Sequence, residues 1–122
     1  MSDIQMGAGE SRFADIIWER EPLRASDLAR AAAESLEWKK TTSYTVLKRL
    51  CDKGLFKNEG GVVTSLVSRE EYYSLRSEKF VEETFGGSLP AFLAAFCAGK
   101  GLSKEEARAL RRMVDEYEEK RK

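Results

Sequence analysis

The sequence of 122 residues predicts a mainly α-helical fold with one small β element. Apolar residues recur three and four positions apart through most of the chain, as they do on one face of a helix. Residues 55–67, LFKNEGGVVTSLV, differ because two short β-prone runs flank a turn sequence. Capping and stop residues divide the helical parts into separate elements. We therefore expect three helices, a β-hairpin and then three more helices.

The chain begins with two predicted helices. Residues 1–9 are expected to be a flexible N-terminus, and the first helix is expected over residues 10–20, where Phe13, Ile16 and Ile17 form an apolar stripe. The stretch EPLR that follows breaks this helix. Ser26 is expected to cap a second helix, SDLARAAAESLEW. The apolar face of the second helix consists of Leu28, Ala29, Ala32 and Leu36.

The third predicted helix runs from about Thr41 to Lys53 and ends at Gly54, because glycine readily takes the positive φ common at a helix C-terminus. At 100° per residue its two sides have different compositions. One side is expected to be core and contains Ser43, Val46, Leu47 and Leu50, with Cys51 at its margin. The other side contains Thr41, Thr45, Lys48 and Asp52, flanked by Tyr44 and Arg49.

The order of these elements predicts a winged helix-turn-helix, in which the hairpin after the third helix is the wing. Asn-Glu-Gly-Gly between the two β-prone runs is a turn signal. Residues 10–68 are therefore expected to form a winged-helix DNA-binding domain. A generic small α+β domain without a DNA role is the alternative interpretation of the same layout.

The C-terminal half is expected to contain three helices. The motif Ser-x-x-Glu occurs at residues 68–71 and 103–106 and is typical of a capping box at a helix start. Gly86-Gly87 and the stretch from Gly99 to Gly101 are expected to end the first two of these helices.

Residues 69–122 are expected to be a helical dimerisation domain. Three short helices of this length cannot bury their large apolar residues alone, so a second copy is expected to complete the core. The expected dimer interface consists of Phe80, Phe85, Leu89, Phe92, Leu93, Phe96, Leu110, Val114 and Tyr117.

The composition argues against several classes of function. Histidine is absent and Cys51 and Cys97 are isolated, which removes His-dependent triads, His-containing zinc sites and Cys-x-x-Cys motifs. No P-loop or dinucleotide-binding glycine pattern occurs, so we expect no enzyme, no metal and no cofactor. No apolar run approaches the roughly 20 residues of a membrane span, and the N-terminus lacks signal-peptide features. A cytoplasmic protein that makes no membrane contact is expected.

The charges are balanced overall but not locally. The chain has 21 basic and 21 acidic residues. Residues 38–57 nevertheless contain six basic residues and one acidic residue, a local charge of +5. Lys39 and Lys40 stand at the start of the third helix, where acidic residues would suit the helix dipole better, which indicates an anionic partner. A local basic surface of this kind fits a nucleic-acid contact.

Several short matches in order along residues 10–120 point to a known family. They are Ile17-Trp18, Trp38, Thr42, Thr45, Leu47, Arg49-Leu50, Lys53-Gly54-Leu55, LVSREEY at 66–72 and FGGSLPAFLAAF at 85–96. With these, the chain resembles the penicillinase-repressor family (BlaI/MecI/CopY type) of dimeric winged-helix repressors. The resemblance implies a homodimer that binds a palindromic double-stranded DNA operator and represses transcription, in many members of β-lactam resistance or copper-transport genes.

The resemblance also implies which residues contact DNA. Operator reading falls on Thr41, Thr42, Tyr44 and Thr45, with further contacts from the wing. The full expected set is Lys39, Lys40, Thr41, Thr42, Tyr44, Thr45, Lys48, Arg49, Lys57, Gly60 and Gly61. Tyr44 stands where β-lactam-responsive members have Arg, and Lys39-Lys40 where Ser-Pro is familiar. Because Tyr cannot grip guanine in the bidentate way that Arg can, we expect a different operator sequence.

The residues tied to induction depart from the family as well. Antibiotic-sensing members are inactivated at an Asn-Phe bond in the short helix of the dimerisation segment, through a sensor-linked protease. The aligned pair here is Ala95-Phe96, which is the candidate proteolysis site. Copper-sensing members carry a C-terminal Cys-x-Cys, which this C-terminus lacks.

The resulting hypothesis is a homodimeric transcriptional repressor that binds a palindromic operator through its third helix and is released when its dimer segment is weakened or cleaved. Its partners would be double-stranded DNA, a second copy of itself and a sensor-linked protease. The alternative is a winged-helix interaction module whose basic face binds an acidic protein.

Overall fold

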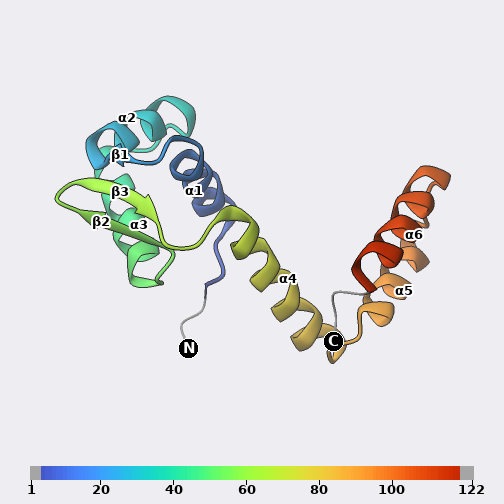
Figure 1. Ribbon diagram of the computed structural model, residues 1–122. Coiled ribbons are helices and arrows are strands. Elements are labelled where there is room, and N and C mark those ends of the chain that lie inside the picture. The colour runs from blue at the N-terminus through green and yellow to red at the C-terminus, as the bar shows by residue number, and fades with distance from the viewer. Residues whose placement is uncertain (1–3, 119–122) are drawn as a thin grey trace. The chain divides into compact units, whose positions relative to one another are not determined.

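The structure, a computed structural model, describes residues 4–118 and divides into two compact units, Met1–Glu78 and Lys79–Lys122 (Figure 1). The described helices are α1 (Ala8–Arg20), α2 (Ala25–Ser35), α3 (Lys40–Asp52), α4 (Arg69–Phe85), α5 (Leu89–Gly99) and α6 (Lys104–Glu118). The described strands are β1 (Leu23–Arg24), β2 (Phe56–Glu59) and β3 (Val62–Ser65). The predicted mainly α-helical fold with a small β element is confirmed.

The strands form a small antiparallel sheet in the order β1-β3-β2. Glu59 pairs with Val62 across a two-residue turn in which Gly60 and Gly61 both have positive φ, 59° and 86°, as a type I′ hairpin requires. This confirms the predicted hairpin. Strand β1 was not predicted, since two residues carry no periodicity and the EPLR stretch indicated only a helix break. Pairing with β3 is what makes it a strand.

The core of the N-terminal unit lies between α1, α2, α3 and the sheet. Its most deeply buried large side chains are Phe13, Ile17, Leu28, Leu50, Leu55, Phe56, Val63 and Tyr72. The two tryptophans flank this core: the Trp38 ring stacks on Phe13 with 5.1 Å between centroids, and the Trp18 Nε1–H donates to the Val67 carbonyl at 2.9 Å. The core therefore fixes α3 by its inner side and leaves its outer side free.

The start of α2 differs from the prediction. Arg24, and not Ser26, is the N-cap residue, and no side chain caps the helix. The backbone N–H of Ala25 instead donates to the carbonyl of Gly61 at 2.8 Å. The Ala25 N–H therefore needs no side-chain cap, because the carbonyl of Gly61 in the wing turn accepts its hydrogen bond. The same bond ties the tip of the wing to α2.

The N-terminal segment contributes to the first helix and to the core. Helix α1 begins at Ala8, and Met6 is buried with its N–H donating to the hydroxyl of Tyr72 at 3.2 Å. Residues 8 and 9 of the segment that was expected to be flexible therefore belong to α1, and its first three residues lie outside the described part. Met6 and Tyr72 of α4 belong to the same apolar core cluster, and no local sequence pattern predicts that these two residues meet.

The boundary between the units lies inside α4. The predicted capping box is present, since Ser68 Oγ accepts from the Glu71 N–H at 3.0 Å and Glu71 Oε1 accepts from the Ser68 N–H at 2.9 Å. The first turns of α4 then pack on the N-terminal unit through buried Tyr72. As a result the division falls after Glu78, later than the boundary predicted after residue 68.

The C-terminal unit has no core of its own. No side chain within residues 79–118 is buried, and the closely packed pairs of elements all belong to the N-terminal unit. The predicted starts of α5 and α6 are confirmed. Ser88 Oγ accepts from the Ala91 N–H at the start of α5, and the predicted capping box of Ser103 and Glu106 is present at the start of α6. In the part of the chain that the structure describes, no helix is long and apolar enough to cross a membrane.

Candidate nucleic-acid interface and dimerisation surface

Helix α3 has the two faces that its sequence predicts. Ser43, Val46, Leu47 and Leu50 are buried. The predicted DNA-facing residues of α3 and of its start are all exposed: Lys39, Lys40, Thr41, Thr42, Tyr44, Thr45, Lys48 and Arg49. The exposed set contains hydroxyls and positive charges and no acidic residue. Its chemistry suits hydrogen bonds to base edges and phosphates.

The start of α3 has the features of an anion-binding helix end. Lys39 is its N-cap residue, and no side chain accepts the N–H groups of its first turn. Among residues 4–118, neither Lys39 nor Lys40 forms an ion pair with an acidic side chain. Free N–H groups and the positive end of the helix dipole together favour a phosphate.

The other basic residues of this surface have acidic neighbours. Lys48 Nζ lies 3.2 Å from Asp52 Oδ2, and Lys57 Nζ lies 3.3 Å from Glu59 Oε1. These are exposed pairs, which contribute little to stability and exchange readily. The charge of +5 counted over residues 38–57 overestimates the charge of this surface, because Glu59, which lies just outside that stretch, is paired with Lys57.

Arg49 has a partner from a distant part of the chain. Its Nη1 donates to Glu10 Oε2 of α1 at 2.7 Å, and Lys53 Nζ lies 3.9 Å from Glu10 Oε1. Burial alone would raise the pKa of Glu10. The hydrogen bonds from Arg49 and from the Gly7 N–H, with the charges of Lys53 and Arg49, outweigh burial and lower that pKa. Sequence reasoning missed Glu10, which no motif connects to α3.

A shallow hollow of about 300 Å³ lies between α3 and the wing strand β2. Tyr44, Lys48 and Cys51 line it from α3, and Asn58 lines it from β2. Asn58 therefore lies beside the exposed side of α3 and is a candidate wing contact in addition to the predicted Lys57, Gly60 and Gly61. Burial raises the pKa of the Cys51 thiol, and the negative charge of Asp52 raises this pKa further. The thiol is therefore protonated at neutral pH.

The predicted dimer interface consists of apolar side chains that are exposed or only half-buried in a single chain. Phe80, Phe85 and Phe92 form a cluster with edge-on ring contacts, with centroids 5.6–5.9 Å apart. Several members stay widely exposed: Phe80 46%, Leu89 55%, Phe96 46%, Val114 63% and Tyr117 52%. The remaining members, Leu93 and Leu110, are half-buried. Ala95 and Phe96, the candidate proteolysis site, are both exposed on α5.

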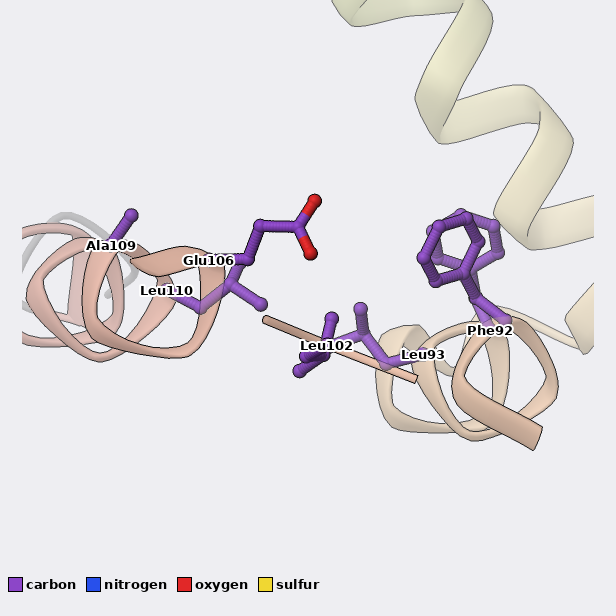
Figure 2. A pocket seen from close by; sticks show the side chains of 7 residues that line it. Phe92, Leu93, Leu102, Glu106, Ala109 and Leu110 are labelled. Carbon is purple, nitrogen blue, oxygen red and sulfur yellow. The ribbon is translucent and has the colours of Figure 1, made fainter. Parts of the chain in front are cut away.

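An apolar pocket of about 350 Å³ opens between α5 and α6 (Figure 2). Phe92, Leu93 and Phe96 line it from α5, and Glu106, Ala109 and Leu110 from α6. Leu102, in the segment before α6, completes the lining and was not predicted. Its position directly before the Ser103 capping box is that of a hydrophobic staple, a signal that could have identified it.

Comparison with known proteins places this geometry in context. Residues 6–116 match the penicillinase repressor family. The chain belongs to the penicillinase repressor family. The family consists of transcriptional repressors and not of enzymes.

Two relatives of this family member cover nearly its full length. It is 24% identical over 122 residues to the penicillinase repressor of Bacillus licheniformis, across 97% of this chain and 95% of that protein. It is 23% identical over 115 residues to the methicillin resistance regulatory protein MecI of Staphylococcus aureus (strain Mu50 / ATCC 700699), across 91% of this chain and 94% of that protein.

A solved structure supports the winged-helix fold of this family member. The solution structure of the DNA-binding domain of the repressor BlaI matches with a TM-score of 0.51 and 25% sequence identity. The match covers 59% of this chain and 94% of that domain. The predicted winged helix-turn-helix of a repressor family is confirmed by these findings together.

Proposed function

We propose that the protein is a homodimeric transcriptional repressor that binds a palindromic DNA operator through α3 of each subunit. The observation that carries this is the exposed face of α3. It combines a start that has two lysines and no side-chain cap with the hydroxyl groups of three threonines and one tyrosine, Thr41, Thr42, Thr45 and Tyr44. Two such helices in a dimer would enter successive major grooves about one DNA turn apart.

The residues of this face have two roles in the proposal. The base edges are read by Thr41, Thr42, Tyr44 and Thr45, since hydroxyls donate and accept and the threonine methyls pack on thymine methyls. Positively charged and backbone groups hold phosphates and carry no sequence information. The phosphate-contacting set consists of Lys39, Lys40, Lys48, Arg49 and, in the wing, Lys57, Gly60 and Gly61.

Dimerisation through residues 69–122 is the second part of the proposal. It is supported by the absence of a buried side chain within residues 79–118 and by the exposed aromatic and aliphatic residues of α4, α5 and α6. A second copy supplies the apolar surface that a single chain lacks. Residues 119–122 of this predicted dimerisation domain lie outside the described part.

Release follows from the same architecture. Weakening the dimer lowers operator affinity because both half-sites must be held at once. Cleavage between Ala95 and Phe96 would have this effect, and the exposure of both residues supports access. α5 would have to open locally to enter a protease, and a sensor-linked protease is the partner that this route requires. A cytoplasmic location is part of the proposal.

Selection of bound sequences from a random duplex pool tests this function. We expect enrichment of a palindrome, and an affinity for it that falls steeply with salt, by about 0.9 in log–log slope for each neutralised phosphate. A pool that returns no enriched sequence would favour the alternative, in which the basic face binds an acidic protein.

A further inference from the structure

Arg49 and Glu10 form an ion pair at one end of the DNA-facing side of α3. Arg49 lies one turn after Thr45 and two turns after Thr42, so helical geometry puts all three on one stripe. Its Nη1 donates to Glu10 Oε2 at 2.7 Å. The Arg49 side chain is 52% exposed and that of Glu10 is 16% exposed. The carboxylate therefore holds a guanidinium that remains accessible to a phosphate.

Glu10 is fixed from other sides as well. Its Oε1 accepts from the Gly7 N–H at 3.1 Å, and Lys53 Nζ lies 3.9 Å from the same oxygen. Lys53 is itself held, since it donates to the carbonyl of Gln5 at 2.5 Å. The carboxylate would therefore stay in place if Arg49 turned toward DNA. A negative charge would then stand beside the phosphates that Arg49 contacts.

We propose that Glu10 is a positioning residue that attenuates DNA binding, because its carboxylate competes with DNA phosphate for the guanidinium of Arg49. This inference rests on the DNA-binding function proposed above. Phosphate contacts carry no sequence information, so the competition lowers affinity for every duplex by a similar factor. Base preference is left to the hydroxyl-bearing residues of α3, and the complex stays dissociable.

The test replaces Glu10 by Gln in the full chain and measures binding to a short duplex of random sequence over a range of salt concentrations. Glu10→Gln keeps an oxygen that can accept from Gly7, so the start of α1 is preserved while the charge is removed. One more neutralised phosphate per bound subunit steepens the log–log slope by about 0.9. If the two proteins bind equally at 1 M salt, this corresponds to about eightfold tighter binding per subunit at 0.1 M.

Three further variants make the result specific. Glu78→Gln is the matched control, because Glu78 is exposed on α4 and forms no ion pair among residues 4–118; its slope should equal that of the unchanged protein. In an Arg49→Gln background, Glu10→Gln should no longer alter the slope. Glu10→Asp withdraws the carboxylate by one methylene and should steepen the slope less, and it replaces the Gln variant if thermal melting shows that variant unfolded.

The outcomes separate this inference from the function beneath it. An unchanged or shallower slope in Glu10→Gln overturns the inference, and so does an equal steepening in Glu78→Gln, which would be a general charge effect. If the unchanged protein does not bind the duplex at low salt, the proposed DNA-binding function itself is refuted, and the inference with it.

Discussion

Val114 gives the sharpest test of the dimer interface. It lies one turn after Leu110 on α6 and is 63% exposed, so its replacement disturbs little within one chain. Fully burying a valine contributes about 1.5–3 kcal/mol, and the exposed share corresponds to about 1–2 kcal/mol per subunit. Two copies therefore contribute about 2–4 kcal/mol to dimerisation, or about 30- to 700-fold in the dimer dissociation constant. Val114→Asp should exceed the lower figure, because a carboxylate would also be desolvated.

Sedimentation equilibrium over a range of protein concentrations measures this constant, and far-UV circular dichroism checks that the helices remain. Arg112→Gln is the control, since Arg112 lies on the opposite side of α6 at 100° per residue and is exposed. Its dimer constant should match that of the unchanged protein. A Val114→Asp protein that dimerises as before would refute the assignment of this stripe to the interface. Val114 is a cleaner probe than Phe92, which contacts three other phenylalanine rings of its own chain.

Three other predictions concern the N-terminal unit. Thr45→Ala should lower base discrimination at one operator position by on the order of 1 kcal/mol, measured by competition binding. Ser43→Ala, on the buried side of the same helix, should leave this discrimination unchanged. Equal effects of the two variants would contradict the assignment of α3 to a buried and a DNA-facing side. Ser43→Ala should raise the free energy of unfolding, measured with urea, by about 1–3 kcal/mol, because the buried Ser43 hydroxyl has no hydrogen-bond partner among the described residues. A lower free energy of unfolding would show that this hydroxyl does form a hydrogen bond. The folded-state pKa of Glu10 is lowered from 4.5, so its stabilising effect is complete above that pH and is lost as pH falls through the lowered value. The stability difference between the unchanged protein and Glu10→Gln should therefore shrink in that acidic range, and a difference that stays constant there would contradict the charge interaction.

Local patterns in the sequence predicted most of the elements and both sides of the recognition helix. The division of α3 into buried Val46, Leu47 and Leu50 and an exposed polar side depends only on residues within a few turns of one another. The capping boxes at Ser68 and Ser103 depend on residues three positions apart. Such signals depend only on residues close together in the sequence, so they can be recognised without knowledge of the tertiary structure.

The exposure of the candidate interface residues was predictable from the sequence, but their ion pairs were not. The exposed residues of α3 follow from helical periodicity. Which of them are paired does not, since Arg49 meets a carboxylate 39 positions earlier in the chain. The same holds for the N-terminal segment, where the Met6 N–H bonds to Tyr72 across 66 positions.

The sequence by itself determined the helices, the hairpin turn, the exposed polar side of α3 and a C-terminal half with too few residues to bury its large apolar side chains. Only the tertiary structure decided that residues 23–24 form a strand beside β3, that the first turns of α4 belong to the N-terminal unit, and that Glu10 stands against Arg49. The physical reason is chain closure: each of these contacts joins distant segments whose meeting is set by how the whole core packs, and no short stretch of sequence contains that information.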